Sequence, residues 1–343
     1  MRLRLCAPET AAALCTLAIA YGSVPAAADP VADFYAGKLL RLYVSAVAGG
    51  GYDNIARAFV RHYSKHVPGK PNAQVMNMPG GGGIVMSNWA YNIAPKDGTV
   101  LAMPNLSMVM NQVIYPSTVK YDATKFHWIG NIEPQVMSIF TWHTSQTRTI
   151  EQAMARVTPM AASTHGSPLQ QILSLSNLTL GTKFQIALGY NDTRVVAIER
   201  GEVDGSVSSL QNFQVLAPHW MENGARLLNI LVINSDKRLP KYPNVPTMLE
   251  LAKTAEHKAM LEFMMLQGLT GRAIFTPPDV PADRLAALRA AFDTTMKDAE
   301  FLADMKRLKV EVETNTGDEV AASVRRVVST SPEIAAKILK AIE

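Results

Sequence analysis

The chain has 343 residues and a formal net charge of +4, and its positive charges do not form a block. Such a small net positive charge, without a cluster of basic residues, argues against a nucleic acid as partner. Both cysteines, Cys6 and Cys15, lie close to the N-terminus, so the rest of the chain has no disulfide, no thiolate nucleophile and no cysteine metal site.

The segment Met1–Ala28 is typical of a secretory signal. Arg2 and Arg4 precede an apolar stretch at 11–24 that is too short to span a bilayer, and small residues end the segment at Ala28. We therefore predict export to the bacterial periplasm with cleavage near Ala28, which agrees with the lack of disulfides. No later segment has the apolar length of a membrane span. The remaining chain is long enough for two α/β lobes.

Strand-like and helix-like segments alternate along most of the chain, which predicts α/β layers with mainly parallel sheets. In the first part, the expected order is strand, helix, strand, helix, strand, over Leu39–Val47, Asp53–Lys65, Val75–Met78, Ser87–Ile93 and Thr99–Met103. Asp53 is expected to cap the first of these helices.

The chain is expected to change lobe near Trp128–Asn131 and to change back after residue 234. The expected strands and helices of the second lobe are Ile139–Trp142, Ile150–Arg156, Pro159–Ala162, Ser167–Asn177, Phe184–Leu188, Thr193–Arg200, Val207–Ser208 and Leu227–Ile233. Two helical segments follow, over Ala282–Lys297 and over Asp318–Ile342 with a break at Pro332. The resulting division is lobe 1 at 29–130 plus 235–343 and lobe 2 at 131–234.

Two glycine runs, Gly49–Gly51 and Gly80–Gly83, each lie between a strand-like segment and a helix-like one. A strand that turns on glycine into a helix presents unpaired backbone N–H groups and the positive end of the helix dipole. Such turns bind anions without Arg or Lys, which points to a small carboxylate or phosphate. Neither run matches G-x-G-x-x-G or a P-loop, so a nucleotide enzyme is disfavoured. The simpler interpretation is that the glycines only permit tight turns.

Two loops of the second lobe carry hydrogen-bonding side chains. Residues Ser163–Ser167 form a hydroxyl-rich loop before a helix, which suits hydrogen bonds to a carboxylate. The alternative is a hydrolase that uses Ser163 or Ser167 with His165, but the G-x-S-x-G elbow is missing. Residues Tyr190–Thr193 follow a strand and are either a ligand loop or an ordinary capping loop, with Arg194 as a further source of charge.

His62 and His66 are four residues apart on one expected helix, as in some metal sites. They lack the Glu of H-E-x-x-H and flank an apolar stripe. We therefore interpret them as solvated or partly buried histidines, and we predict neither a metal nor a cofactor.

Several short motifs follow one another along the chain, and their order and spacing are specific. They are Leu42–Arg57 with its glycines before Asp53, Asn77–Gly80, Ala94–Thr99, Gly189–Tyr190, Gly201–Asp204 and Val245–Thr247. Together they resemble the substrate-binding receptors of tripartite tricarboxylate transporters, the Bug-type periplasmic solute-binding proteins, from about Phe34 to the C-terminus. The resemblance implies a two-lobed, type II-like periplasmic binding protein. Each lobe would be a mainly parallel sheet flanked by helices, with the ligand in the interlobe cleft.

The resemblance also implies a small-molecule carboxylate as ligand, a two-subunit membrane permease as partner, no cofactor and no catalytic residue, and we expect a monomer. Combined with the loops above, it predicts ligand contacts at Ala48, Gly49, Gly50, Gly51, Tyr52, Asp53, Gly81, Gly82, Gly83, Asn105, Ser163, Thr164, His165, Gly166, Ser167, Tyr190, Asn191, Asp192 and Thr193. One departure from the family pattern is Ser45–Ala48, which replaces the usual Pro-Phe-Ala-Pro and predicts a roomier wall for a bulkier or aromatic acid. A receptor that reports its ligand to a sensor protein, and the hydrolase, stay as alternatives.

Overall fold

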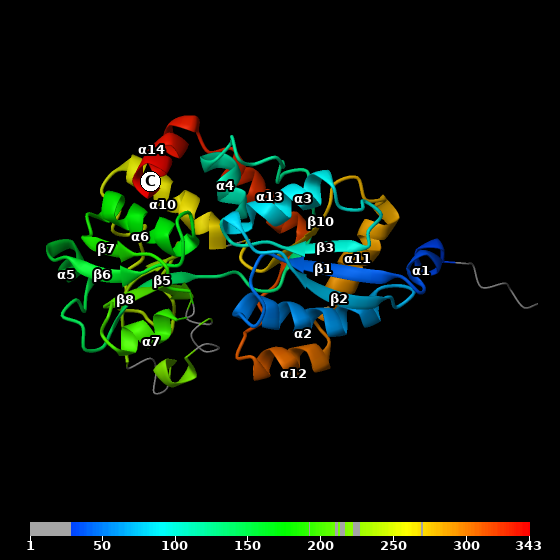
Figure 1. Ribbon diagram of the computed structural model, residues 1–343, viewed down its shortest axis with the longest axis horizontal. Coiled ribbons are helices and arrows are strands. Elements are labelled where there is room, and N and C mark those ends of the chain that lie inside the picture. The colour runs from blue at the N-terminus through cyan, green and yellow to red at the C-terminus, as the bar shows by residue number, and fades with distance from the viewer. Residues whose placement is uncertain (1–28, 192, 210–211, 213–216, 222–226, 269) are drawn as a thin grey trace, which may run out of the picture.

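The computed structural model describes residues 29–343 except 192, 210–211, 213–216, 222–226 and 269. The predicted signal Met1–Ala28 and the candidate residue Asp192 therefore lie outside the described residues. The described chain forms two β-sheets side by side, each covered by helices on both faces (Figure 1). Among the described residues, no helix combines the length and apolar character that crossing a bilayer requires.

The first sheet has six strands in the order β11-β4-β10-β3-β1-β2. These strands are β1 Leu39–Val44, β2 Asn72–Asn77, β3 Val100–Met103, β4 His127–Asn131, β10 Ala273–Thr276 and β11 Asn315–Thr316. β1 pairs in parallel with β2 and β3, as the alternation of strands and helices predicts. β10 is antiparallel to both β3 and β4, and β11 is antiparallel to β4.

The second sheet has five strands in the order β7-β6-β8-β5-β9. They are β5 Met137–Trp142, β6 Thr158–Ala161, β7 Phe184–Ala187, β8 Gly205–Ser209 and β9 Leu228–Asn234. β6 is parallel to β7 and β8, whereas β5 is antiparallel to β8 and β9. The two-sheet α/β architecture is thus confirmed, but both sheets are mixed. The antiparallel pairs form around the strands that begin or end at a crossing between the sheets, namely β4, β5, β9 and β10.

Helices cover both faces of the six-stranded sheet (Figure 1). On one face lie α2 Gly51–His66, α11 Ala282–Thr295 and α12 Ala299–Arg307, with α1 Pro30–Tyr35 packed on α11. On the other face lie the short η1 Gly81–Gly83, α3 Ile84–Asn92, α4 Met108–Ile114 and α13 Gly317–Val328. Alternate residues of β1, such as Leu40 and Leu42, pack into the core beneath α2, as the period of two in a strand requires.

The five-stranded sheet is covered by α6 Pro168–Leu180 and α5 Ile150–Ala155, and by α7 Arg194–Glu199 and η2 Pro218–Met221. Two C-terminal helices, α10 Ala255–Gly268 and α14 Pro332–Ile342, pack against α6. They belong to the segment that the sequence assigns to lobe 1, and that division stays a prediction. One continuous apolar core runs from α4 and α13 through α10 and α14 to α6. The two sheets therefore share a core.

The chain crosses between the sheets twice. The first crossing is 132–136, between β4 and β5, and the second is 235–272, between β9 and β10. At their ends the two crossings are hydrogen-bonded to each other, from Gln135 N–H to the carbonyl of Gly268 at 2.8 Å and from Ile132 N–H to the carbonyl of Arg272 at 3.2 Å.

Candidate ligand-binding site

A cavity of about 460 Å³ lies where loops of the two sheets face each other. Ten of the residues that the sequence predicts as ligand contacts line it: Gly50, Gly51, Tyr52, Gly81, Gly82, Asn105, Ser163, Thr164, Ser167 and Asn191. Of the other described candidates, Ala48, Gly49, Asp53, Gly83, His165, Gly166, Tyr190 and Thr193 are not part of the lining. Both glycine runs and the hydroxyl-rich loop thus meet at one cavity.

The first wall is the N-terminus of the 16-residue helix α2. Gly50 occupies the capping position, and the first bond of the helix runs from Asn54 N–H to the Gly50 carbonyl at 3.0 Å. The N–H groups of Gly51 and Tyr52 therefore lie outside the bonds of the helix itself. Because both residues line the cavity, the positive end of the helix dipole faces it.

The sequence predicted Asp53 as the cap of α2, and this prediction is wrong. The helix begins two residues earlier, at Gly51. The buried Asp53 carboxylate instead accepts hydrogen bonds from the Gly49 N–H at 2.9 Å, from Arg57 Nε at 2.8 Å and from Asn77 Nδ2 at 2.9 Å. Burial alone raises the pKa of Asp53, but these hydrogen bonds outweigh it and hold the pKa below its usual value. Asp53 thus fixes the glycine turn from behind, where its charge does not face an anion in the cavity.

The second wall is the glycine loop at η1. Gly81, Gly82 and Gly83 all have positive φ, at 54°, 58° and 93°, which favours glycine over residues with a side chain. Asn111 Nδ2 donates to the Gly82 carbonyl at 3.2 Å and fixes this peptide group. A Cβ on Gly82 would lie 2.9 Å from Asn111 Nδ2, so the loop has no space for a side chain there.

The wall from the five-stranded sheet is the N-terminus of α6. Ser167 caps this helix and Pro168 is its first residue, as predicted. The Ser167 hydroxyl accepts a hydrogen bond from the Gln170 N–H at 3.4 Å. His165 is exposed and outside the cavity lining, and no hydrogen bond between described residues joins it to Ser163 or Ser167. Among the described residues, the Ser167 hydroxyl is therefore used as a helix cap, and neither serine is hydrogen-bonded to a histidine.

Arg194 is the one charged side chain among the described residues that line the cavity. It is buried, and its Nη1 donates to the carbonyl of Asn191 at 2.7 Å. Tyr52 donates from its hydroxyl to the Gly271 carbonyl, and burial raises the Tyr52 pKa well above its usual value. The remaining lining consists of neutral donors, acceptors and apolar groups, which suits a ligand held by hydrogen bonds.

Several lining residues were missed as ligand contacts by the sequence analysis. They are Pro79, Gly80, Leu106, Gln135, Met137, Pro168, Leu169, Ser208, Ser209 and Asn212. The pair Ser208–Ser209 lies at the carboxyl end of β8, a position where α/β folds place ligand loops, so a signal was present. Gln135 had no such signal, because it lies in a short crossing segment.

The segment that departs from the family pattern also lines the cavity, through Ser45, Ala46 and Val47. The Ser45 hydroxyl is buried and has no hydrogen-bond partner in the described part of the chain. A buried hydroxyl without a partner is costly, so this group is suited to bond with a bound molecule.

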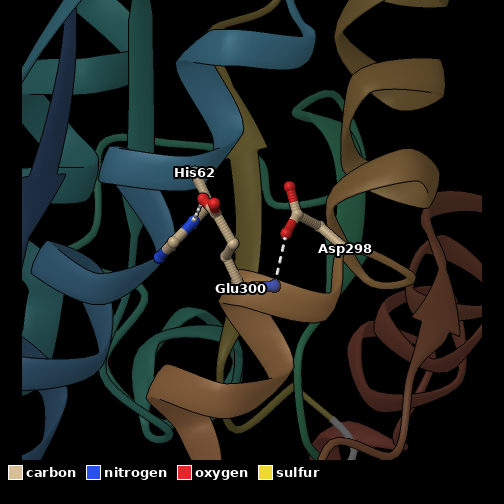
Figure 2. Close-up of side chains that lie close together, drawn as sticks. All are labelled: His62, Asp298 and Glu300. Atoms are coloured by element: carbon tan, nitrogen blue, oxygen red, sulfur yellow. Dashed lines mark hydrogen bonds and ion pairs between the residues drawn. The ribbon is translucent and has the colours of Figure 1, made fainter.

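A separate cluster joins α2 to α12 on the outer face of the first sheet. Figure 2 shows His62, Asp298 and Glu300, whose ligand-type atoms lie within 4.8 Å of one another. Each is already bonded: His62 Nε2 lies 2.8 Å from Asp304, Lys65 Nζ lies 2.5 Å from Glu300, and His66 Nε2 lies 2.7 Å from Asp298. Because the Lys65 ammonium already contacts both Glu300 and His62 Nδ1, we interpret the cluster as an interhelical network of salt bridges.

Several proteins of known structure have a similar fold. BugD, described as a periplasmic binding protein, matches with a TM-score of 0.66 and 18% identity over 90% of this chain and 98% of its own. MatC from Rhodopseudomonas palustris, solved with bound malate, matches with a TM-score of 0.65 and 18% identity over 89% of this chain and 99% of its own. The chain has the fold of these binding proteins.

A third protein with this binding-protein fold is a TctC solute-binding protein from Polaromonas. It matches with a TM-score of 0.63 and 18% identity, over 90% of this chain and 99% of that one. The resemblance noted in the sequence is therefore confirmed at the level of the fold. No family model and no curated protein sequence matches the chain.

Proposed function

We propose that this chain is a periplasmic solute-binding protein that captures a small organic carboxylate for a tripartite tricarboxylate-type transporter. The ligand would occupy the cavity between the two sheets, with its carboxylate oxygens on loop and helix N–H groups. The fold shared with BugD, TctC and the malate-bound MatC supports the class of protein. The chemistry of the cavity supports the class of ligand.

The observation that carries the proposal is the convergence of two helix N-termini on one cavity. α2 comes from the six-stranded sheet and α6 from the side of the five-stranded sheet, and both are longer than three turns. The dipoles of both helices favour negative charge at the same place. The buried Ser45 hydroxyl and the hydroxyls of Ser163 and Thr164 add neutral donors around it.

The proposal is tested by a thermal-shift panel of carboxylic acids after unfolding and refolding have removed any copurified molecule. The panel contains malate, succinate, adipate, citrate and aromatic acids, because the wall at Ser45–Val47 suggests room for a bulkier acid. An acid present at about 100 times its dissociation constant stabilises the protein by about 2.7 kcal/mol. Melting temperatures that no acid in the panel raises would contradict the proposal.

Two variants tie binding to the cavity. Ser45→Ala removes the buried hydroxyl and is expected to weaken binding of the best acid about 10-fold, the order of one hydrogen bond to a charged group. Ser64→Ala, on α2 but outside the cavity lining, is the matched control and should leave affinity unchanged. Equal affinities of wild type and Ser45→Ala would place the ligand elsewhere.

Partnership with a permease is tested separately, by asking whether liposomes that contain a two-subunit permease of the tripartite tricarboxylate type take up the acid only when this protein is added. Activation of a sensor kinase instead of uptake would favour a signalling receptor. Hydrolysis of esters or amides that Ser167→Ala abolishes would favour a hydrolase.

A further inference from the structure

Gln135 reaches the cavity from the first crossing between the two sheets. It is 7% exposed and lines the cavity, although its backbone belongs to neither sheet. The backbone is fixed, because the Gln135 N–H donates to the Gly268 carbonyl at 2.8 Å. The side chain also lies against Gly271, where an added Cβ would come within 2.6 Å of the Gln135 Cγ. The position of this amide is therefore well defined.

Behind Gln135 lies an ion pair between Glu133 and Arg272, which joins the two crossings. Both side chains are fully buried, and the Arg272 backbone N–H donates to Asn131 Oδ1 at 3.1 Å. A buried guanidinium has five N–H donors and no acceptor, so each donor needs an oxygen. Glu133 accepts from Nη1.

The remaining donors of Arg272 decide how the Gln135 amide is oriented. With its oxygen toward Arg272, Gln135 accepts hydrogen bonds of 3.0 Å from Nε and 3.0 Å from Nη2. The opposite orientation would place the amide N–H groups against the guanidinium N–H groups, donor facing donor. The oxygen is therefore committed to Arg272, and the amide nitrogen with its two hydrogens is left as the donor side of Gln135.

We propose that Gln135 is a ligand-binding residue whose amide nitrogen donates a hydrogen bond to an anionic oxygen of the bound acid. Arg272 and Glu133 are positioning residues, which hold the amide in its donor orientation without touching the ligand. This inference rests on the proposed function. It adds a side-chain donor from the crossing between the sheets to the N–H groups that the glycine loops supply.

The arrangement also explains why a positive charge lies beneath a site for an anion without binding it directly. In its ionised form Glu133 balances the charge of Arg272, so the pair then contributes an oriented donor in place of a free cation. A hydrogen bond to an ionised acceptor is stronger than one between neutral groups. The donor therefore favours a carboxylate over its amide or ester.

The test measures dissociation constants by isothermal titration calorimetry for the acid of the panel that binds wild type most tightly, beginning with malate and succinate. Gln135→Met keeps the volume and removes the donor, and it is expected to weaken binding about 10- to 100-fold. Gln135→Glu is expected to weaken binding further, because its carboxylate repels the acid. Gln267→Met, a buried glutamine outside the cavity lining, is the control and should change affinity less than about 2-fold.

The positioning role is tested by replacing both charges together, as Glu133→Leu with Arg272→Met, so that no unpaired charge is buried. If the pair acts by orienting Gln135, this double variant loses affinity about as much as Gln135→Met, and adding Gln135→Met to it costs nothing more. Losses that simply add would show that the pair affects binding independently of Gln135 and would overturn the positioning role.

Unchanged affinity in Gln135→Met, with wild type binding normally, would overturn the role of Gln135 and leave the proposed function intact. A wild-type protein that binds none of the acids would overturn both.

Discussion

The buried Glu133 gives the protein a pH dependence of stability that is opposite to that of most carboxylates. Burial raises the pKa of Glu133 from its usual 4.5 to about 7, against the opposing charge of Arg272 and with Glu313 and Glu311 adding to the rise. Between these two values the folded protein keeps a proton that the unfolded chain has already released. Stability therefore falls as the pH rises through this window.

The size of the effect follows from the two pKa values. They differ by about 2.5, and each pKa unit is worth about 1.4 kcal/mol, so the free energy of unfolding is expected to fall by about 3 kcal/mol. The loss is complete above about pH 7 and absent below about pH 4.5. Carboxylates with lowered pKa values, such as Asp53 and Asp298, titrate below this window and do not obscure it.

The assay is urea denaturation of wild type and Glu133→Gln at several pH values between about 5 and 8. Glutamine cannot titrate, so the difference in unfolding free energy between the two proteins isolates Glu133. Histidines and other groups contribute equally to both and cancel. The free energy of unfolding of wild type relative to Glu133→Gln should be highest at about pH 5. This difference should fall by about 3 kcal/mol toward neutral pH. A difference that is the same at every pH would refute the reasoning.

Two further predictions concern the glycine loops. Asp53→Ala removes three hydrogen bonds to a buried carboxylate and is expected to lower the free energy of unfolding by about 2–3 kcal/mol, measured by urea denaturation; an unchanged midpoint would show that the carboxylate does not hold the turn. Gly82→Ala introduces a Cβ at φ 58° beside Asn111 and should cost more stability than Gly201→Ala, which has a similar φ of 72° but open space around it. Thermal melts of the two variants give the comparison, and equal losses would mean that backbone strain alone explains Gly82.

The sequence predicted the elements whose signals are local. The glycine runs, the Ser167–Pro168 helix start and the strands from Leu39 to Met103 are all present, because turns, caps and alternating apolar residues leave marks within a few residues. The sequence analysis placed the start of α2 two residues too late. Asp is a residue type that often caps helices, but the Asp53 carboxylate instead accepts a hydrogen bond from the Gly49 N–H. Composition alone does not separate these two roles.

What the sequence did not predict depends on contacts between distant segments. α10 and β10 were missed, and β10 lies between β3 and β4 only because the chain returns from the other sheet. Gln135 and Arg272 are far apart in sequence and meet where the two crossings run together. No periodicity or motif marks such a meeting, since it is fixed by the topology of the whole chain.

The shared core sets a limit on how far the two sheets can separate. On the inner side of α6, Gln171 is bonded to Gln267 at 3.2 Å, and Gln170 donates to the Ile342 carbonyl at 2.6 Å. Pulling α6 away from α10 and α14 would break these buried amide bonds and expose apolar surface at the same time. Local movement of the loops that line the cavity breaks neither kind of contact, so it demands less free energy than a wide swing of one half of the molecule.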